Sequence, residues 1–406
     1  LKIVDYINNQ TFNTNRFGSI NTAPVVGDAG FFGVFPILQY GGTITSNDTT
    51  YDGETLFDDL IIDGANLYID EDYNAKANIT VKNGGKIIAG TNGKIIFDPG
   101  KKLIIEGTAE IKGTSASNKL SLEFAGTEKG LDVMPGSNLM LNYCNISGAY
   151  NGLVTRTGTP GYLNITNSNF AFGSTGIVLN GNFYGEGSST SATSTISNCN
   201  FTTSGTGIGV TNNSSVIISQ NNFTSCGISI LNVPAAYIQG NNISAGTNTS
   251  NPGIFFNNSG GYIRSNIIKN RVNGIHLANS SPDVGGNILE DNYKHGLYIG
   301  SGSIPNLVGY IQVNPPLYFP LRGYNTIRNN GINPVPGTEN DGSEIYLSSA
   351  NISLRDGCNE IVDDRQNPPN TGTILLVNGS LAVGGGRQLD ARNNYWGTIT
   401  PTSSRF

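Results

Sequence analysis

Residues 266–278 read NIIKNRVNGIHLA, and this stretch decides the fold. Asn266 stands two positions before a large apolar residue, Ile268, and a Gly-Ile-x-Leu phrase begins at Gly274. The same pair of phrases recurs along the C-terminal two thirds of the chain. The apolar anchor falls at Ile146, Phe170, Phe201, Phe223, Ile243, Ile268, Leu289, Ile327, Ile361 and Tyr395. Successive anchors lie 20 to 38 residues apart around a basic period of 20 to 25, which predicts one coil of a β-solenoid per repeat.

Small or amide side chains fill the position two residues before each anchor. This position holds Cys144, Ser168, Cys199, Asn221, Asn241, Asn266, Asn287, Asn325, Asn359 and Asn393. An inward-facing Asn at the same bend of every coil donates to one neighbour and accepts from the other, which satisfies amides that would otherwise cost about 1 to 3 kcal/mol each. Asn also tolerates the left-handed backbone of a tight bend. We therefore predict an internal asparagine ladder.

Three short strands in each coil imply three parallel sheets. The Gly-Ile phrase supplies one strand, the anchor supplies a second, and short apolar runs such as Val216-Ile217-Ile218 supply the third. Residues 79–124 continue the pattern with Gly-separated strands about eight residues apart. The sequence predicts an all-β, single-stranded parallel β-helix of about 13 coils over residues 56–406, with an N-terminal cap over residues 1–55.

The composition narrows the class of protein. The chain has 406 residues, of which 54 are Gly, and 13% are charged, while 37% hydrophobic residues suffice to fill a core. A net charge of -6 gives no basic surface for nucleic acid or anionic lipid. No stretch approaches the roughly 18 consecutive apolar residues of a membrane helix, which argues against membrane insertion. Because the chain starts at Leu1, we expect a processed form or a part of a longer precursor.

The Asn-x-Ile and Gly-Ile-x-Leu phrases at this period resemble the right-handed parallel β-helix repeat proteins of the pectate-lyase-like superfamily. The resemblance covers roughly residues 79–397. Residues 79–107 and 389–397 also resemble secreted surface proteins of Bacteroidota-like bacteria. The resemblance implies a right-handed helix and a secreted or cell-surface location. It leaves activity open, because this scaffold carries lyases, hydrolases, epimerases and adhesins.

In the resembled family, the outer face of the Gly-Ile-x-Leu strand lines the substrate groove. Alternation along the strand turns x outward. These outward positions are Val178, Gly209, Ser229, Phe255, His276, Tyr298, Tyr346 and Leu375. Sugars stack their C–H faces on aromatic rings, so Phe255, His276, Tyr298 and Tyr346, with Arg271 beside them, are the predicted substrate-binding residues. Insertions at residues 331–342 and 363–372 either wall a groove or cover these rings.

Catalysis on polysaccharides needs paired carboxylates, an acid-base pair, or Ca²⁺ with a Lys or Arg base. The candidate catalytic residues are His276, Tyr298, Lys294 and Glu290, with His276 and Tyr298 one coil apart at the same outward position. Residues 293–296 match the Gly-His-Gly of polygalacturonases only in part. The Arg-x-Pro-x-x-Arg of pectate lyases and the Asp-Pro-His of alginate epimerases are absent from the sequence. These departures favour a protein without catalytic activity.

Two hypotheses for the function follow. The first is an extracellular β-helix module that binds polysaccharide or cell-surface glycan, or that serves as a structural or adhesive rod contacting other surface proteins. The alternative is a polysaccharide lyase, glycoside hydrolase or epimerase that works along the Gly-Ile-x-Leu sheet.

No cofactor or resident metal is expected, although two acidic pairs are of the type that holds Ca²⁺. The pairs are Glu339 with Asp341 and Asp363 with Asp364. The four cysteines are predicted to stay as thiols, because Cys144 and Cys199 sit two coils apart, about 9.6 Å by strand spacing, beyond the reach of a disulfide.

Overall fold

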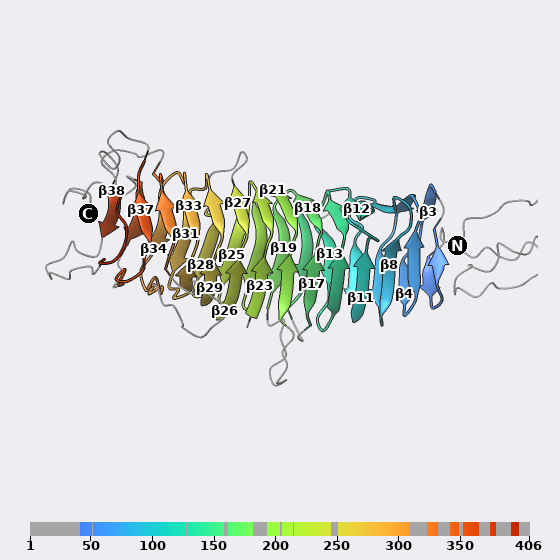
Figure 1. The fold of residues 1–406 in the computed structure, drawn as a ribbon. Helices are drawn as coiled ribbons and strands as arrows, with labels where there is room; N and C mark the ends of the chain where they lie inside the picture. Colours follow the sequence, from blue (N-terminus) through green and yellow to red (C-terminus); the bar gives the residue numbers. More distant parts are fainter. Residues whose placement is uncertain are drawn as a thin grey trace, which may run out of the picture. The chain divides into compact units, whose positions relative to one another are not determined.

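Short strands that recur in threes make up the described parts of the chain, and no helix occurs among them (Figure 1). The computed structural model describes residues 41–50, 52–126, 128–157, 161–181, 193–203, 205–213, 215–244, 251–308, 323–331, 342–348, 352–364, 374–378 and 391–397. The chain divides into unit 1, residues 1–192, and unit 2, residues 193–406, and each unit is described by itself.

Unit 1 contains three sheets of parallel strands, and each coil contributes one strand to each sheet. Sheet A1 has the order β1 (Gly42–Ile44), β4 (Leu60–Asp63), β7 (Ile79–Lys82), β10 (Leu103–Glu106), β13 (Lys129–Val133), β16 (Asn151–Thr155) and β19 (Thr175–Asn180). Sheet B1 has the order β2 (Asp48–Thr49), β5 (Asn66–Ile69), β8 (Gly85–Ala89), β11 (Thr108–Lys112), β14 (Asn138–Asn142) and β17 (Leu163–Thr166). Sheet C1 has the order β3 (Glu54–Leu56), β6 (Asp72–Ala75), β9 (Lys94–Phe97), β12 (Leu120–Phe124), β15 (Cys144–Ser147) and β18 (Asn169–Phe172).

Unit 2 repeats this plan with three further sets of parallel strands. Sheet A2 has the order β22 (Thr206–Thr211), β25 (Gly227–Leu231), β28 (Ile254–Asn257), β31 (Asn273–Ala278), β34 (His295–Ile299), β36 (Ser343–Leu347) and β38 (Ile374–Asn378). Sheet B2 has the order β20 (Ser194–Ser197), β23 (Ser215–Ser219), β26 (Ala235–Gln239), β29 (Gly261–Arg264) and β32 (Asp283–Gly285). Sheet C2 has the order β21 (Asn200–Thr203), β24 (Asn222–Thr224), β27 (Asn242–Ser244), β30 (Ile267–Lys269), β33 (Ile288–Glu290), β35 (Thr326–Arg328) and β37 (Glu360–Val362).

The strand order confirms the predicted right-handed parallel β-helix, because each strand pairs with the strand of the same sheet in the next coil. The paired strands are three apart in sequence up to β31 with β34, and two apart from β33 with β35 onward, after the last strand of sheet B2. The described chain begins at residue 41, so most of the predicted cap lies outside the described residues. Strands β1, β2 and β3 precede residue 57 and already form a coil, since they pair with β4, β5 and β6. The boundary between a cap and the helix stays a prediction.

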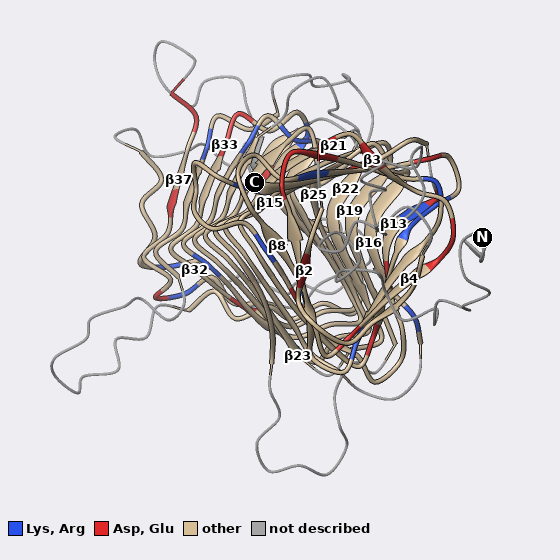
Figure 2. Ribbon diagram, turned by 90° about the vertical axis from the view of Figure 1, so that its right-hand side faces the viewer, with Lys and Arg blue, Asp and Glu red and all other residues tan. Residues whose placement is uncertain are grey.

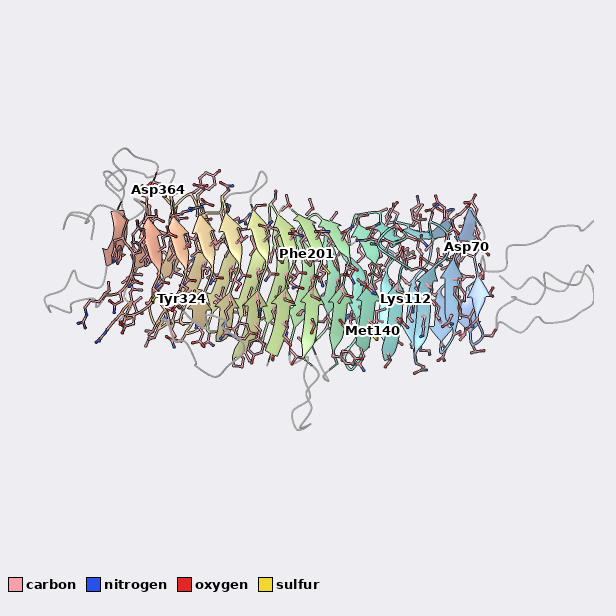
Figure 3. All side chains as sticks on the ribbon, viewed as in Figure 1. Asp70, Lys112, Met140, Phe201, Tyr324 and Asp364 are labelled. Carbon is pink, nitrogen blue, oxygen red and sulfur yellow. The ribbon has the colours of Figure 1, made fainter. Side chains whose placement is uncertain are left out.

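Apolar side chains fill the interior of each coil, because alternate residues of every strand point inward. Aromatic rings in successive coils stack on one another, as Phe97 does on Phe124 with ring centroids 4.6 Å apart in unit 1. In unit 2 the rings of Phe201, labelled in Figure 3, and Phe223 are 4.8 Å apart. Charged residues appear in Figure 2 only as short, scattered segments, with no extended run of either sign among the described residues.

The asparagine ladder runs through the interior of unit 2. The Nδ2 atom of Asn221 donates to Oδ1 of Asn241 at 3.0 Å, and Asn241 donates to Asn266 at 3.0 Å. The series continues to Asn287, Asn325 and Asn359 with bonds of 2.9 to 3.0 Å. Each Oδ1 also accepts the backbone N–H of the preceding ladder residue. These bonds confirm the predicted ladder for all six of these residues.

Among the described residues the ladder ends at Asn394, and the prediction of Asn393 was wrong by one position. Asn359 donates to Oδ1 of Asn394 at 2.9 Å, whereas Asn393 is exposed and donates to Asp356. The backbone explains the shift, because Asn393 has a φ of 61°. The left-handed residue of each bend precedes the ladder residue instead of being the ladder residue, as at Gln220 before Asn221.

A second internal column lies where the chain passes from sheet C2 to sheet A2. The backbone N–H of Arg271 donates to Oδ1 of Asn292 at 3.0 Å. Asn292 donates to Asn330 at 2.8 Å, and Asn330 donates to the Glu344 carboxylate at 2.5 Å. All of these side chains are buried. Glu344 stands where earlier coils have the Gly of the Gly-Ile phrase, so its carboxylate closes this column.

Gly227 in β25 is held against the backbone of the next coil. A Cβ atom there would lie 2.4 Å from the carbonyl oxygen of Gly253 and 2.6 Å from that of Pro252. We expect Gly227→Ala to destabilise the protein by about 1 to 3 kcal/mol, because backbone atoms have to move. Gly209→Ala is the matched control, since the nearest atom to its Cβ would be 3.8 Å away. Urea unfolding of both variants tests this, and equal midpoints would contradict it.

Candidate functional site

An aromatic column runs down the outer face of sheet A2, one residue per strand. The strand register pairs Ser229 with Phe255, Phe255 with His276, His276 with Tyr298, and Tyr298 with Tyr346. The predicted outward positions therefore line up as the sequence period required. On β38, the residue that pairs with Tyr346 is Val377. The outward position predicted at Leu375 was therefore wrong by two residues.

The rings of this column contact one another directly. The ring centroids of Phe255 and His276 are 5.0 Å apart with an edge-on geometry, and those of His276 and Tyr298 are 4.4 Å apart. Tyr298 stacks on Tyr346 at 5.0 Å with an interplanar angle of 10°. Phe255, His276 and Tyr298 keep part of their surface exposed, while Tyr346 is only 9% exposed. The column thus presents ring surface over successive coils.

A second outer column lies beside the first, at the residue that precedes the Gly of each Gly-Ile phrase. It consists of Asn273, His295 and Ser343, which pair in register on β31, β34 and β36. The His295 ring lies 5.6 Å from that of Tyr298 and 4.8 Å from that of Tyr346. We call these three residues together with Phe255, His276, Tyr298 and Tyr346 the A2 patch.

His295 is fixed by a buried hydrogen bond. Its Nδ1 atom lies 3.0 Å from Oγ of Ser343, and this hydroxyl donates to the carbonyl oxygen of Ile345 at 3.0 Å. His295 is 3% exposed and Ser343 is fully buried. Sequence reasoning did not select Asn273 or Ser343 for the site. The available signal was their constant position directly before the Gly of the phrase, or before Glu344 in its place.

Burial keeps both imidazoles of the A2 patch neutral near pH 7. It lowers the pKa of His276 to about 4. It lowers the pKa of His295 to about 3, with smaller contributions from the charges of Lys294 and His276. Neutral imidazoles donate and accept one hydrogen bond each, but they supply no positive charge to a ligand.

Glu290 lies on β33 in sheet C2, on a different sheet from His276. It is the centre of an ion-pair triad, with Lys269 on one side and Arg328 on the other, where Arg328 Nε donates to its carboxylate at 2.8 Å. Burial alone would raise the pKa of Glu290, but the hydrogen bonds and charges of Lys269 and Arg328 lower it. One oxygen accepts the hydrogen bond from Arg328 and the other is ion-paired with Lys269, which argues against a general acid at this position.

The structure places Arg271 inside unit 2, which corrects its assignment as a ligand-binding residue. Its side chain is 0% exposed, and a Cβ atom on Gly253 would come within 3.4 Å of it. Arg271 occupies the internal column that continues with Asn292, three residues after the apolar anchor. A ligand on the outer face of sheet A2 has no access to a side chain in this position.

Lys294 precedes His295 in the connection from β33 to β34. Its backbone is fixed, because its N–H donates to Val272 and its carbonyl accepts the N–H of Ser343. Its charge is near enough to lower the pKa of His295. Of the predicted catalytic residues, the structure thus brings His276 and Tyr298 into ring contact, places Lys294 next to His295 in the chain, and holds Glu290 on sheet C2.

No group of three or more metal-ligating side chains occurs among the described residues. Glu339 and Asp341 lie outside the described residues, while Asp363 is buried and Asp364, labelled in Figure 3, is exposed. The side chains of this second pair therefore lie in different surroundings. The four cysteines are thiols, as predicted, with Cys358 exposed and the other three buried.

Comparisons with known proteins agree with the fold. Within the described residues, no helix has the length and apolar character needed to cross a membrane. Searches of curated proteins and of solved structures gave no match. Residues 154–309 match the family model described as a right handed beta helix region. The matched range includes β28, β31 and β34 of the A2 patch. This match agrees with the strand topology of a right-handed parallel β-helix.

Proposed function

We propose that this chain is an extracellular β-helix module that binds glycan through the A2 patch. The observation that carries the proposal is the continuous ring column from Phe255 to Tyr346, with centroid separations of 4.4 to 5.0 Å. Rings aligned along a stack of coils offer an extended sugar chain one C–H contact after another. The proposed partners are polysaccharide, cell-surface glycan and other surface proteins, and a rod with such a face is suited to adhesion.

A secreted or cell-surface location is part of this proposal. It is supported by the resemblance of residues 79–107 and 389–397 to secreted surface proteins of Bacteroidota-like bacteria. The sparse charge and the flat polar outer faces of the sheets suit a surface structure. The proposal needs no cofactor, and Ca²⁺ remains a candidate only for the acidic pairs at residues 339–341 and 363–364.

The alternative function is that of a polysaccharide lyase, glycoside hydrolase or epimerase. The contact between His276 and Tyr298 favours it, because these groups exchange protons with sugars in such enzymes. An enzyme of this kind also needs a second ionisable group within hydrogen-bond reach. Glu290, the predicted carboxylate partner, is held instead by Lys269 and Arg328. We therefore place glycan binding first.

The binding proposal is tested with Tyr298→Ala, which removes the ring that contacts His276, His295 and Tyr346. Loss of one stacking ring is expected to weaken binding to a retained oligosaccharide by roughly 5- to 50-fold, from about 1 to 2.3 kcal/mol. The measurement is titration calorimetry on ligands found by a glycan-array screen.

Tyr262→Ala is the matched control, because Tyr262 is a partly exposed ring on sheet B2 that packs against Tyr237 with ring centroids 4.6 Å apart. It should leave glycan affinity unchanged. Equal losses in the two variants, or no retained oligosaccharide at all, would refute binding at the A2 patch. Assays for reducing ends and unsaturated products on every retained ligand decide between binding and cleavage.

A further inference from the structure

Asn273 stands out among the polar residues of the A2 patch. Its side chain is 7% exposed, yet its Oδ1 atom accepts no hydrogen bond from the protein. Buried carbonyl oxygens are nearly always paired, because leaving one unpaired destabilises a folded protein. By contrast, each Oδ1 of the internal asparagines Asn241, Asn266 and Asn292 accepts at least one backbone N–H. An unpaired amide oxygen in a protein so rich in paired ones calls for an external donor.

The strand register aims Asn273 into the A2 patch. Its partner on β34 is His295, and paired residues of parallel strands point to the same face. The His295 ring contacts Tyr298 and Tyr346 of the outer column, so this face is the outer one. A Cβ atom on the next residue, Gly274, would point toward the buried Asn292. The interior of the coil therefore lies on the side of Gly274, opposite to the side that Asn273 faces.

The surroundings of Asn273 favour an uncharged donor. His276 and His295 are neutral near pH 7, and the cations Lys269 and Arg328 of sheet C2 both pair with Glu290. The charge of Lys294 acts on His295, so the amide oxygen of Asn273 is the group that discriminates between ligands here. A carboxylate or sulfate brought to this place would meet the negative end of the Asn273 carbonyl. A sugar hydroxyl, which donates one hydrogen bond and carries no charge, fits both the carbonyl and the neighbouring rings.

We infer that Asn273 Oδ1 is a specificity-determining acceptor for a hydroxyl group of an uncharged sugar residue seated on the ring column beside His276. This inference rests on the proposed function and adds the ligand class, a neutral glycan, and the residue that selects it. Asn273 contacts the ligand directly, while Ser343 acts through His295 as a positioning residue.

The test combines stability and binding in Asn273→Leu. Leu branches at Cγ as Asn does and has no acceptor, so the thermal unfolding midpoint is expected to stay the same or to rise, because an unpaired oxygen disappears. Affinity for a neutral hexasaccharide such as cellohexaose or mannohexaose, whichever the wild type binds, is expected to fall by roughly tenfold. Asn292→Leu is the matched control and should lower the unfolding midpoint strongly, because Asn292 bonds Asn330 and the backbone of Ile268.

Three results would overturn the inference. A midpoint for Asn273→Leu that falls as far as that of Asn292→Leu would show that its oxygen has a structural role. Unchanged affinity in Asn273→Leu, with reduced affinity in Tyr298→Ala, would remove Asn273 as the acceptor while leaving the proposed function standing. Tighter binding of hexagalacturonate than of the neutral hexasaccharides would refute the ligand class. Absence of any oligosaccharide binding by the wild type would overturn both the inference and the function.

Discussion

Asn241→Leu is expected to lower the free energy of unfolding by about 3 to 6 kcal/mol. The substitution removes Nδ2 of Asn241, which donates to the carbonyl oxygen of Ile218. It also removes Oδ1, which accepts from the backbone N–H and from Nδ2 of Asn221. Each buried group left without its partner costs about 1 to 3 kcal/mol, and the apolar side chain of Leu replaces none of these bonds. The measurement is the urea dependence of unfolding followed by circular dichroism.

Asn242→Leu provides a control at the adjacent residue. Asn242 lies on the outer face of β27 and is exposed, so the same chemical change should alter stability by less than about 0.5 kcal/mol. The large difference between neighbouring positions follows only from the inward and outward alternation of the strand. Similar effects in the two variants would contradict the ladder register.

Acidification is expected to destabilise the protein already at pH values well above the pH range in which carboxylates titrate. The native pKa values of His276 and His295, about 4 and about 3, lie below the ordinary value of 6.5. The unfolded chain therefore binds more protons than the native one, so stability falls as pH drops below about 6.5 and continues to fall until the native pKa is reached. At pH 4.5 the loss is roughly 2 to 3 kcal/mol for each imidazole. Urea midpoints at pH 7.0, 5.5 and 4.5 and constant ionic strength measure it.

The double variant His276→Gln and His295→Gln separates this effect from that of the acidic residues. The pKa values of Asp132, Glu110 and Glu290 are lowered in the native state, so their contribution is present above the unfolded pKa and is lost only below about pH 4.5. The variant should therefore show nearly constant stability between pH 6.5 and 4.5. A wild-type protein with the same flat profile would show that the imidazoles are not buried.

The repeat period predicted most of the fold because it determines both the path of the backbone and the side chains that face the interior. Ladder residues such as Asn221 could be identified because a buried amide at one fixed offset has a single favourable arrangement. The period could not separate Asn393 from Asn394, since the two are chemically identical, and only the left-handed backbone at residue 393 decides which one turns inward.

The candidate site was harder to predict than the fold. The ring column followed from alternation, but Arg271 was expected at the surface because charged side chains are rarely fully buried. Its position three residues after the anchor is the one that Asn292 and Asn330 fill in the next coils, both facing inward. Asn273 was missed for a related reason. Its importance lies in a hydrogen bond that the protein does not make, and its constant position before the Gly of the phrase does not reveal this.

The internal asparagines also give the stack a direction. Every amide from Asn221 to Asn359 offers its oxygen to the lower-numbered coil and one of its hydrogens to the higher-numbered coil, so the bonds between the amides all run in the same direction. From Asn221 to Asn325 the other hydrogen returns to a backbone carbonyl of the lower-numbered coil, as from Asn241 to Ile218. Each amide polarises the next one, which makes the series of hydrogen bonds stronger than the sum of single bonds. Asn394 ends the series by returning its hydrogens to the carbonyls of Leu354 and Ala391. Within the described residues, Asn394 is thus the point where bonding from amide to amide gives way to bonding from amide to backbone.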